Sequence, residues 1–327
     1  MRLTEKDTGF LTNLEHDDDS VLVLPPIDDP SWTKQCWGQA AHDLVTQLFE
    51  LIDGQAPIVP RAVRKRARVQ VGRFRRLNDS MFFEAAPPPD CLYRFDAELD
   101  KLIDIVADTG AVTCDGHEVS EAAWHCEVHS PVLQIEGKLV DFSLNLDLRA
   151  VATEANQPST LLEERLVRLL ATQPRGWRTI NQTTYGPALL LPCAVSIVAK
   201  SSTAAGSEVD AREQLTLWIS AWFGRMSLLL QAINIGCDEE GGNSAPLPRV
   251  PLTIPLIYVI GGKWTLLLAR DGPDYIYIAK VGVIGDTESL MGAYLLLASL
   301  RLIIRWIEGP FKEWIEQTLQ RWDDAKT

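Results

Sequence analysis

Residues able to take part in catalysis or binding occur in successive stretches of the chain. Asp141 lies on the polar side of the alternating stretch 138–148, a pattern that predicts a strand with one polar face. Lys200 closes a later apolar stretch, and Val198 shares its strand face because side chains alternate. Gln214 follows near the start of a predicted helix. A carboxylate, an ammonium group and an amide from adjacent elements could form a polar site; alternatively, Asp141 is a surface residue of an edge strand and Lys200 a solvent-facing strand terminus.

The elements that would position these residues can be predicted from hydrophobic periodicity. We expect helices at 37–52, 96–107, 119–128, 161–170, 211–233, 289–306 and 311–322, and strands at 138–148, 188–200, 254–260, 264–269 and 275–281. The nearly uniform apolar character of 188–200 predicts a buried central strand. The order of helices and strands indicates one α/β domain over 36–327, preceded by a flexible acidic tail over 1–35.

Several short segments between Val119 and Trp314 form a recognisable series. They are Glu121-Ala-Ala-Trp-His-Cys-Glu-Val-His-Ser-Pro131, Lys138-Leu-Val-Asp-Phe142, Asn181-Gln-Thr-Thr-Tyr185, Ala194-Val-Ser-Ile-Val-Ala-Lys200 and Gln214-Leu-Thr-Leu-Trp218. In this order and spacing they resemble the fungal PD-(D/E)XK nuclease-like family. The resemblance implies a restriction-endonuclease-like fold, in which a central mixed sheet is flanked by helices.

The resemblance also implies roles for individual residues. In that family an Asp on one strand, and an acid two residues before a Lys on the next strand, hold a divalent metal that activates water for attack on a phosphodiester. Asp141 matches the metal-binding Asp and Lys200 matches the Lys. Glu121 matches an acid on the first helix, and Gln214 matches a Gln on the later helix.

Val198 stands where this family has its second metal-binding acid. Valine cannot ligate a cation, and its branched apolar body occupies the place where one would sit. Glu213 could replace the missing acid, but it lies about 100° around the helix from Gln214, so we do not expect both to face one site. We therefore predict a site without metal or other cofactor. Mg²⁺, held by Asp141 and Glu121, belongs only to the alternative of a working nuclease.

An apolar residue in place of a metal ligand suits a small hydrophobic organic substrate. We predict an enzyme that promotes a cyclisation, isomerisation or cycloaddition without metal, and the resemblance implies a role in fungal secondary metabolism. The predicted catalytic residues are Asp141, Lys200, Glu121 and Gln214. The predicted substrate-binding residues are Val198, Ser196, Ser143, Trp218, Tyr185 and Asn181. As a structural alternative, Asn181-Gln-Thr-Thr184 is a loop that satisfies its own backbone.

Two other functions stay open at this point. One is a Mg²⁺-dependent DNA nuclease that uses a displaced acid, and the other is a catalytically dead nucleic-acid-binding protein. The 31 basic and 44 acidic residues give a net charge of -13, which disfavours broad electrostatic binding to nucleic acid or anionic membranes. Residues 61–76, the basic strip, oppose this balance with eight Lys and Arg residues. The basic strip could bind a nucleic-acid backbone or direct nuclear import; alternatively, it is a solvated loop that neutralises the acidic tail.

The location of the protein can also be predicted from the sequence. Residues 1–10 mix charges of both signs, and no apolar secretory segment follows. The apolar run 290–300 is shorter than the roughly 20 residues that a membrane span needs. The six cysteines lie far apart and have no C-x-x-C spacing, which is typical of reduced thiols. We predict an intracellular protein, cytoplasmic or nuclear, without a membrane partner; the sequence does not indicate its oligomeric state.

Overall fold

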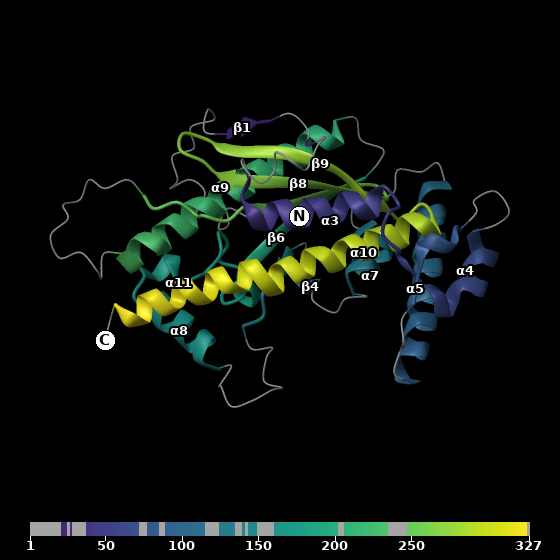
Figure 1. The fold of residues 1–327 in the computed structure, drawn as a ribbon. Helices are drawn as coiled ribbons and strands as arrows, with labels where there is room; N and C mark the ends of the chain where they lie inside the picture. Colours follow the sequence, from purple (N-terminus) through teal and green to yellow (C-terminus); the bar gives the residue numbers. More distant parts are fainter. Residues whose placement is uncertain are drawn as a thin grey trace.

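The computed structural model describes residues 21–24, 27, 37–71, 77–84, 89–114, 124–134, 139–140, 143–148, 160–201, 206–234 and 247–325. In this part of the chain, seven strands form one mixed sheet in the order β1-β9-β8-β7-β6-β5-β4 (Figure 1). The strands are β1 (Val21–Val23), β4 (Leu139–Val140), β5 (Ser143–Asn145), β6 (Cys193–Lys200), β7 (Ile254–Ile260), β8 (Lys263–Asp271) and β9 (Ile276–Asp286). A separate parallel pair joins β2 (Val59–Pro60) to β3 (Phe82–Phe83).

Strand β6 lies inside the sheet, as the apolar stretch predicted. It pairs antiparallel with β5 and parallel with β7. Its first five residues are buried, because helices cover both faces of the sheet at this point. A parallel neighbour requires a crossover connection, and helix α9 (Ser207–Asn234) provides it between β6 and β7. The crossover returns the chain across the sheet, so the N-terminus of α9 lies near the end of β6 that carries Lys200.

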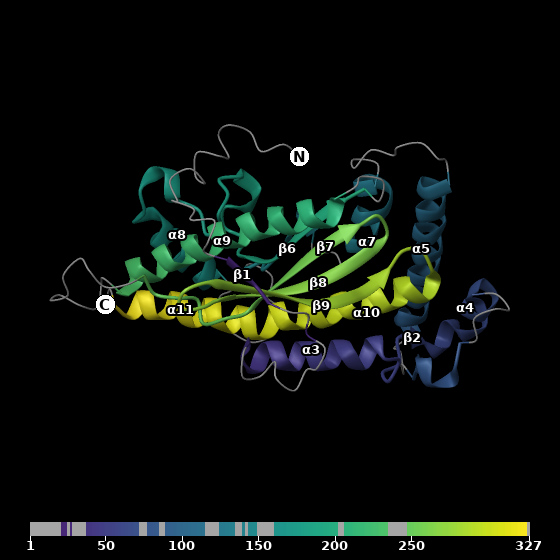
Figure 2. The same cartoon turned by 90° about the horizontal axis from the view of Figure 1, so that it is seen from above.

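The helices form a layer on each side of the sheet (Figures 1 and 2). Helix α9 packs on β6 and β7, whereas α3 (Gln39–Ile52) and α10 (Leu290–Trp306) lie on the opposite side. Gly285 in β9 permits the close approach of α10, since its φ is +148° and a Cβ atom there would overlap the backbone of Leu296. The remaining long helices are α4 (Arg64–Val71), α5 (Pro89–Cys114), α8 (Thr160–Ala171) and α11 (Lys312–Asp324).

The C-terminal helices form one rod instead of the two separate helices that the sequence predicted. Leu290–Asp324 is continuous over 35 residues and is apolar enough to span a membrane by length and composition, but 72% of its apolar window is buried within the protein. The rod therefore serves as a core helix. A π-helical turn at Ile307–Phe311 contains Pro310 and lets the helix continue where the proline lacks an N–H.

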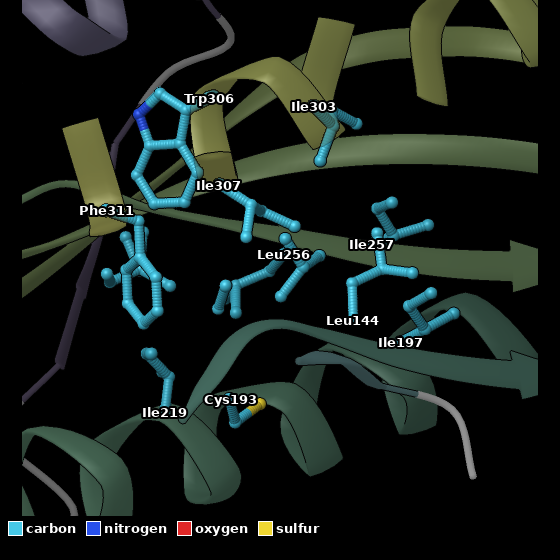
Figure 3. Close-up of a cluster of buried hydrophobic side chains, with 14 of the residues drawn as sticks. Leu144, Cys193, Ile197, Ile219, Leu256, Ile257, Ile303, Trp306, Ile307 and Phe311 are labelled. Carbon is cyan, nitrogen blue, oxygen red and sulfur yellow. The ribbon is translucent and has the colours of Figure 1, made fainter. Parts of the chain in front are cut away.

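The main hydrophobic core fills the space between the sheet and the helices on both of its faces, and it includes residues of α9 as well as of this rod. Figure 3 shows apolar side chains of the rod facing apolar side chains of the sheet. The labelled residues are Leu144, Cys193, Ile197, Ile219, Leu256, Ile257, Ile303, Trp306, Ile307 and Phe311. A second, smaller core joins α4, α5, β3 and the first half of α10.

Three sequence predictions are corrected by the fold. The predicted tail is wrong for 21–24 and 27, because β1 pairs with the edge of β9 and Ile27 is buried. The single strand over 138–148 is wrong, because β4 and β5 are separate antiparallel neighbours. The helix predicted over 119–128 does not end there: a π-helical turn at His125–His129 leads directly into α7 (Ser130–Gln134), and Pro131 lies within this continuous helical segment.

Candidate functional site

Val198 and Lys200 lie on the same face of β6, near its C-terminal end. Val198 is half-buried against the main core, and Lys200 is also half-buried. Val198 is opposite Tyr258 in the parallel pairing of β6 with β7. Tyr258 is in turn opposite Thr265 in the antiparallel pairing of β7 with β8. The row that continues from Val198 therefore presents an isopropyl group, a phenol and a hydroxyl on one side of the sheet.

Glu208, Tyr258 and Lys280 form a polar cluster on this side of the sheet, which we call the Glu208 cluster. The hydroxyl of Tyr258 donates a hydrogen bond of 2.6 Å to Glu208 Oε1, and Lys280 Nζ lies 3.0 Å from the same oxygen. The ammonium group also lies 5.7 Å from the centre of the Tyr258 ring. Tyr258 is buried, whereas the Glu208 and Lys280 side chains are half-exposed. One carboxylate thus links α9, β7 and β9.

Each ionisable group of the Glu208 cluster keeps one protonation state near neutral pH. The hydrogen bond from Tyr258, followed by that from Lys280, lowers the pKa of Glu208. Burial, followed by the bond to Glu208, raises the pKa of Tyr258, and the bond with Tyr258 raises the pKa of Lys280. All three shifts move titration away from neutral pH. The cluster is therefore suited to anchoring the first turn of α9 beside Val198 and poorly suited to exchanging protons.

Hydrogen bonds through Gly261 connect the backbone of Lys200 to the π-helical turn His125–His129. Gly261 N donates a hydrogen bond of 2.9 Å to Lys200 O. His129 Nε2 lies 2.9 Å from Gly261 O, and the imidazole donates in the tautomer that carries its proton on Nε2. The buried His129 ring also stacks on Trp124 and meets Trp264 edge-on. This arrangement fixes the turn between β7 and β8 next to the end of β6.

The Asn181 side chain is bonded to the backbone of the residues that lead into β6. Its side chain is 1% exposed. Its Nδ2 donates to Ala188 O at 2.6 Å and to Leu191 O at 2.8 Å, and its Oδ1 accepts from Cys193 N at 2.8 Å. These bonds use the amide of Asn181 to hold the loop that enters β6. The binding role predicted for Asn181 therefore has no support from its contacts.

The same loop is held from the other side by Arg225 of α9. Its guanidinium is fully buried and donates to the carbonyl oxygens of Thr179 and Trp177 at 2.7 to 2.9 Å. Burial lowers the pKa of Arg225 to about 10. Tyr185, which the sequence placed near the substrate, is exposed and precedes β6, at the opposite end of the strand from Lys200.

Ser143 and Ser196 are opposite each other on β5 and β6. Ser196 is 4% exposed, and its Oγ lies 3.6 Å from Cys193 Sγ. Burial raises the pKa of the Cys193 thiol to about 11, with hydrogen bonds from Ser196 and Ser143 acting in the opposite direction. This thiol is therefore protonated and unreactive at neutral pH.

The predicted site residues of α9 lie away from the Glu208 cluster. Gln214 and Trp218 share one side of the helix, where Gln214 is exposed and Trp218 is half-buried. Six positions separate Glu208 from Gln214, which places their side chains about 120° apart around the helix axis. Glu213 is exposed. Asp141 and Glu121, the two predicted catalytic acids, lie outside the described residues, so their roles stay predictions.

A comparison with protein-family models gives one match. The model described as PD-(D/E)XK nuclease superfamily matches residues 135–312, which are 178 of the 327 residues. The chain belongs to the PD-(D/E)XK nuclease superfamily. The mixed sheet with helices on both faces is accordingly a restriction-endonuclease-like fold. No curated protein and no solved structure matches the chain.

Most PD-(D/E)XK chemistry implies a divalent metal, so the donor groups of this chain need testing against one. Mg²⁺ requires several clustered oxygen ligands, usually carboxylates. Val198 offers none, and Glu208 already accepts from Tyr258 and Lys280. Within the described ranges, no three His, Cys, Asp or Glu side chains are grouped in a way that could hold a metal ion. Asp141 and Glu121, the two acids that the resemblance assigns to a metal, lie outside these ranges.

Four of the five described Lys and Arg residues of the basic strip pair with acids of the same chain. Arg61 lies 2.5 Å from Glu84, and Arg68 lies 2.8 Å from Asp79, which also pairs with Arg64. Arg66 bridges two acids of α5, Asp96 and Asp100. These partners lie between residues 79 and 100, outside the acidic tail that the basic strip was expected to neutralise. Arg73, Arg75 and Arg76 lie outside the described residues.

Proposed function

We propose that this PD-(D/E)XK superfamily member acts without a metal on a small hydrophobic organic substrate. The observation that supports the proposal is Val198, an apolar and half-buried residue two positions before Lys200. A restriction-endonuclease-like fold that lacks this acid loses an oxygen ligand and gains an apolar contact surface beside its lysine. We further infer that this reaction belongs to secondary metabolism, an inference that the resemblance to the fungal family supports, and that it takes place in an intracellular setting, which the sequence features favour.

In this proposal, Lys200 supplies a positive charge at the substrate. Its ammonium group would donate a hydrogen bond to a carbonyl or related oxygen and stabilise negative charge that develops there. Asp141 and Glu121 would act as acid and base, and Gln214 would orient the substrate. Val198, Trp218 and the β5–β6 serines would contact its apolar and polar parts. A cyclisation, isomerisation or cycloaddition needs only this orientation and charge stabilisation.

The proposal is tested first by binding. Titration with 2-acetylnaphthalene, which has an apolar ring system and one carbonyl oxygen, would be followed by tryptophan fluorescence. We expect saturable quenching, and Lys200→Met should weaken binding about tenfold because a charged hydrogen bond is lost. Lys263→Met is the matched control, since Lys263 is exposed at the neighbouring β7–β8 turn. Absence of saturable binding, or equal losses in both variants, would contradict the proposal.

Superfamily membership favours a second candidate, a Mg²⁺-dependent DNA nuclease with Asp141, Glu121 and a displaced acid. Incubation of supercoiled plasmid with the protein and Mg²⁺ or Mn²⁺ tests it. Cleavage that disappears in Asp141→Asn would establish the nuclease and refute the metal-independent proposal. An intact plasmid at high protein concentration is the expected result.

A role as a nucleic-acid-binding protein without catalysis is disfavoured by the ion pairs of the basic strip. Arginines already paired with Asp and Glu release few counterions when they meet phosphates, so binding should be weak. Retention of labelled DNA at 50 mM and 200 mM salt would check this expectation.

A further inference from the structure

A cavity of about 130 Å³ lies beside the start of β6, at the opposite end of the strand from Lys200. An eight-residue strand spans about 23 Å, so this cavity is separate from the site proposed above. Three parts of the chain line it: the residues that follow β5, helix α8, and the loop that enters β6. The lining residues are Asp147, Leu148, Glu163, Gly186, Pro187, Leu190 and Leu191.

The lining combines an apolar wall with two carboxylates. Leu148 is buried, and Leu190 and Leu191 are half-buried. Both charged lining residues, Asp147 and Glu163, are acidic, and the described lining contains no Lys, Arg or His. Asp147 also interacts with another part of the chain, so the charge that would repel an anionic ligand and attract a positively charged group is that of Glu163.

Glu163 is the more informative of the two acids. It is half-buried, and within the part of the chain that the structure describes it has no hydrogen-bond or ion-pair partner. The arginines of its own helix are committed elsewhere, because Arg165 and Arg168 each lie 3.0 Å from a carboxylate oxygen of Asp323 in α11. The negative charge of Glu163 is therefore available to a ligand in the cavity.

The volume limits the size of that ligand. A protein cavity of about 150 Å³ holds a benzene molecule. A cavity of about 130 Å³ therefore suits one small ring or a short branched alkyl group, with a charged group directed to the open side. A neutral ligand would remove water from the Glu163 carboxylate without replacing the hydrogen bonds that this water makes, which costs free energy.

We propose that this cavity binds a small organic cation, an ammonium group attached to an apolar body of about one ring. The apolar body packs against Leu148, Leu190 and Leu191, and the ammonium group pairs with Glu163. The site does not depend on the function proposed for Lys200, so either can fail without the other.

Benzylamine is the probe, and benzyl alcohol is its neutral counterpart of nearly the same shape. Binding to the full chain would be measured by calorimetry and by chemical-shift changes of leucine methyl groups at neutral pH. We expect benzylamine to bind at least tenfold more tightly than benzyl alcohol, and to weaken as salt is raised. Glu163→Gln should weaken benzylamine about tenfold and leave benzyl alcohol almost unchanged.

Glu164→Gln is the matched control, because Glu164 is the next residue of α8, is exposed and does not line the cavity. Asp147→Asn provides a second variant should Glu163→Gln fold poorly, which circular dichroism would reveal. The proposal is overturned if benzyl alcohol binds as tightly as benzylamine, if Glu164→Gln loses as much affinity as Glu163→Gln, or if no benzylamine binding is detected up to tens of millimolar.

Discussion

Val198 on β6 lies in parallel register with Tyr258 on β7. The position where the resembled family has a metal-binding acid is thus next to a phenol whose hydroxyl is bonded to Glu208. An acid at position 198 would enter an environment that already contains one carboxylate and one ammonium group. These contacts allow the effects of substitutions at Val198 and Glu208 to be predicted.

Val198→Glu should restore an acid two residues before Lys200. We expect this variant to bind Mg²⁺ or Mn²⁺ more tightly than the wild type does, because a carboxylate oxygen would then face the predicted position of Asp141. Calorimetric metal titration measures the gain, and plasmid nicking would accompany it if the remaining ligands are in place. Val198→Gln, similar in size but without charge, is the control. Equal metal affinity in the Gln and Glu variants would contradict the expectation.

Glu208→Gln should loosen the start of α9. The substitution removes the charge that accepts from Tyr258 and Lys280, and we expect a loss of about 1 kcal/mol in the free energy of unfolding, kept small by the exposure of Glu208 and Lys280. Urea denaturation measures it. Glu213→Gln, on the same helix and exposed, should leave stability unchanged. A comparable loss in both variants would show that general helix effects, not the Glu208 cluster, are responsible.

The contribution of Glu208 should depend on pH in one direction. Because the folded-state pKa of its carboxyl lies below the ordinary value of 4.5, Glu208 adds stability above that pH. The contribution is lost as pH falls through the lower, folded-state pKa. The stability difference between wild type and Glu208→Gln should therefore be constant near neutral pH and shrink in acid. Urea midpoints for both proteins between pH 7 and pH 3 check this; a difference that grows in acid would refute it.

Asn181→Ala should be strongly destabilising, by about 2–4 kcal/mol, because it leaves two carbonyl oxygens and the Cys193 N–H buried without their present partner. Thermal and urea unfolding would measure the effect. Thr184→Ala, in the same loop but exposed, should have little effect. A stable Asn181→Ala protein with altered ligand binding would instead restore the binding role that the sequence suggested.

Much of the fold could be predicted from periodicity. The three strands from 254 to 281, the central strand and the long crossover helix all have strong apolar patterns, and the structure has each of them within a few residues. The wrong predictions share one cause: a local hydrophobic pattern does not show which strands pair with each other. The alternation across 138–148 fits one strand as well as two antiparallel strands, and three apolar residues at 21–23 give no sign of a partner near 277.

The candidate site was predictable only in part. Two residues on one strand, Val198 and Lys200, are placed together by alternation alone. Glu208 was missed since its partners Tyr258 and Lys280 are 50 and 72 residues away, and only the sheet register brings them together. An acid in the first turn of a helix is also common for dipole reasons, so its presence there carried no specific signal.

The pairing of Val21 with Ile276 has a consequence for the order of folding. During synthesis the ribosome releases β1 some 250 residues before β9, so this edge of the sheet stays incomplete until most of the domain has emerged. Leu22 and Val23 must remain unpaired through that period, when a hydrophobic strand is prone to associate with other chains. The acidic run that precedes β1 in the sequence would keep the unpaired β1 segment in solution by charge repulsion. Docking of β1 is therefore expected to be a late step, and the N-terminal segment should be the first part of the domain to detach on mild denaturation.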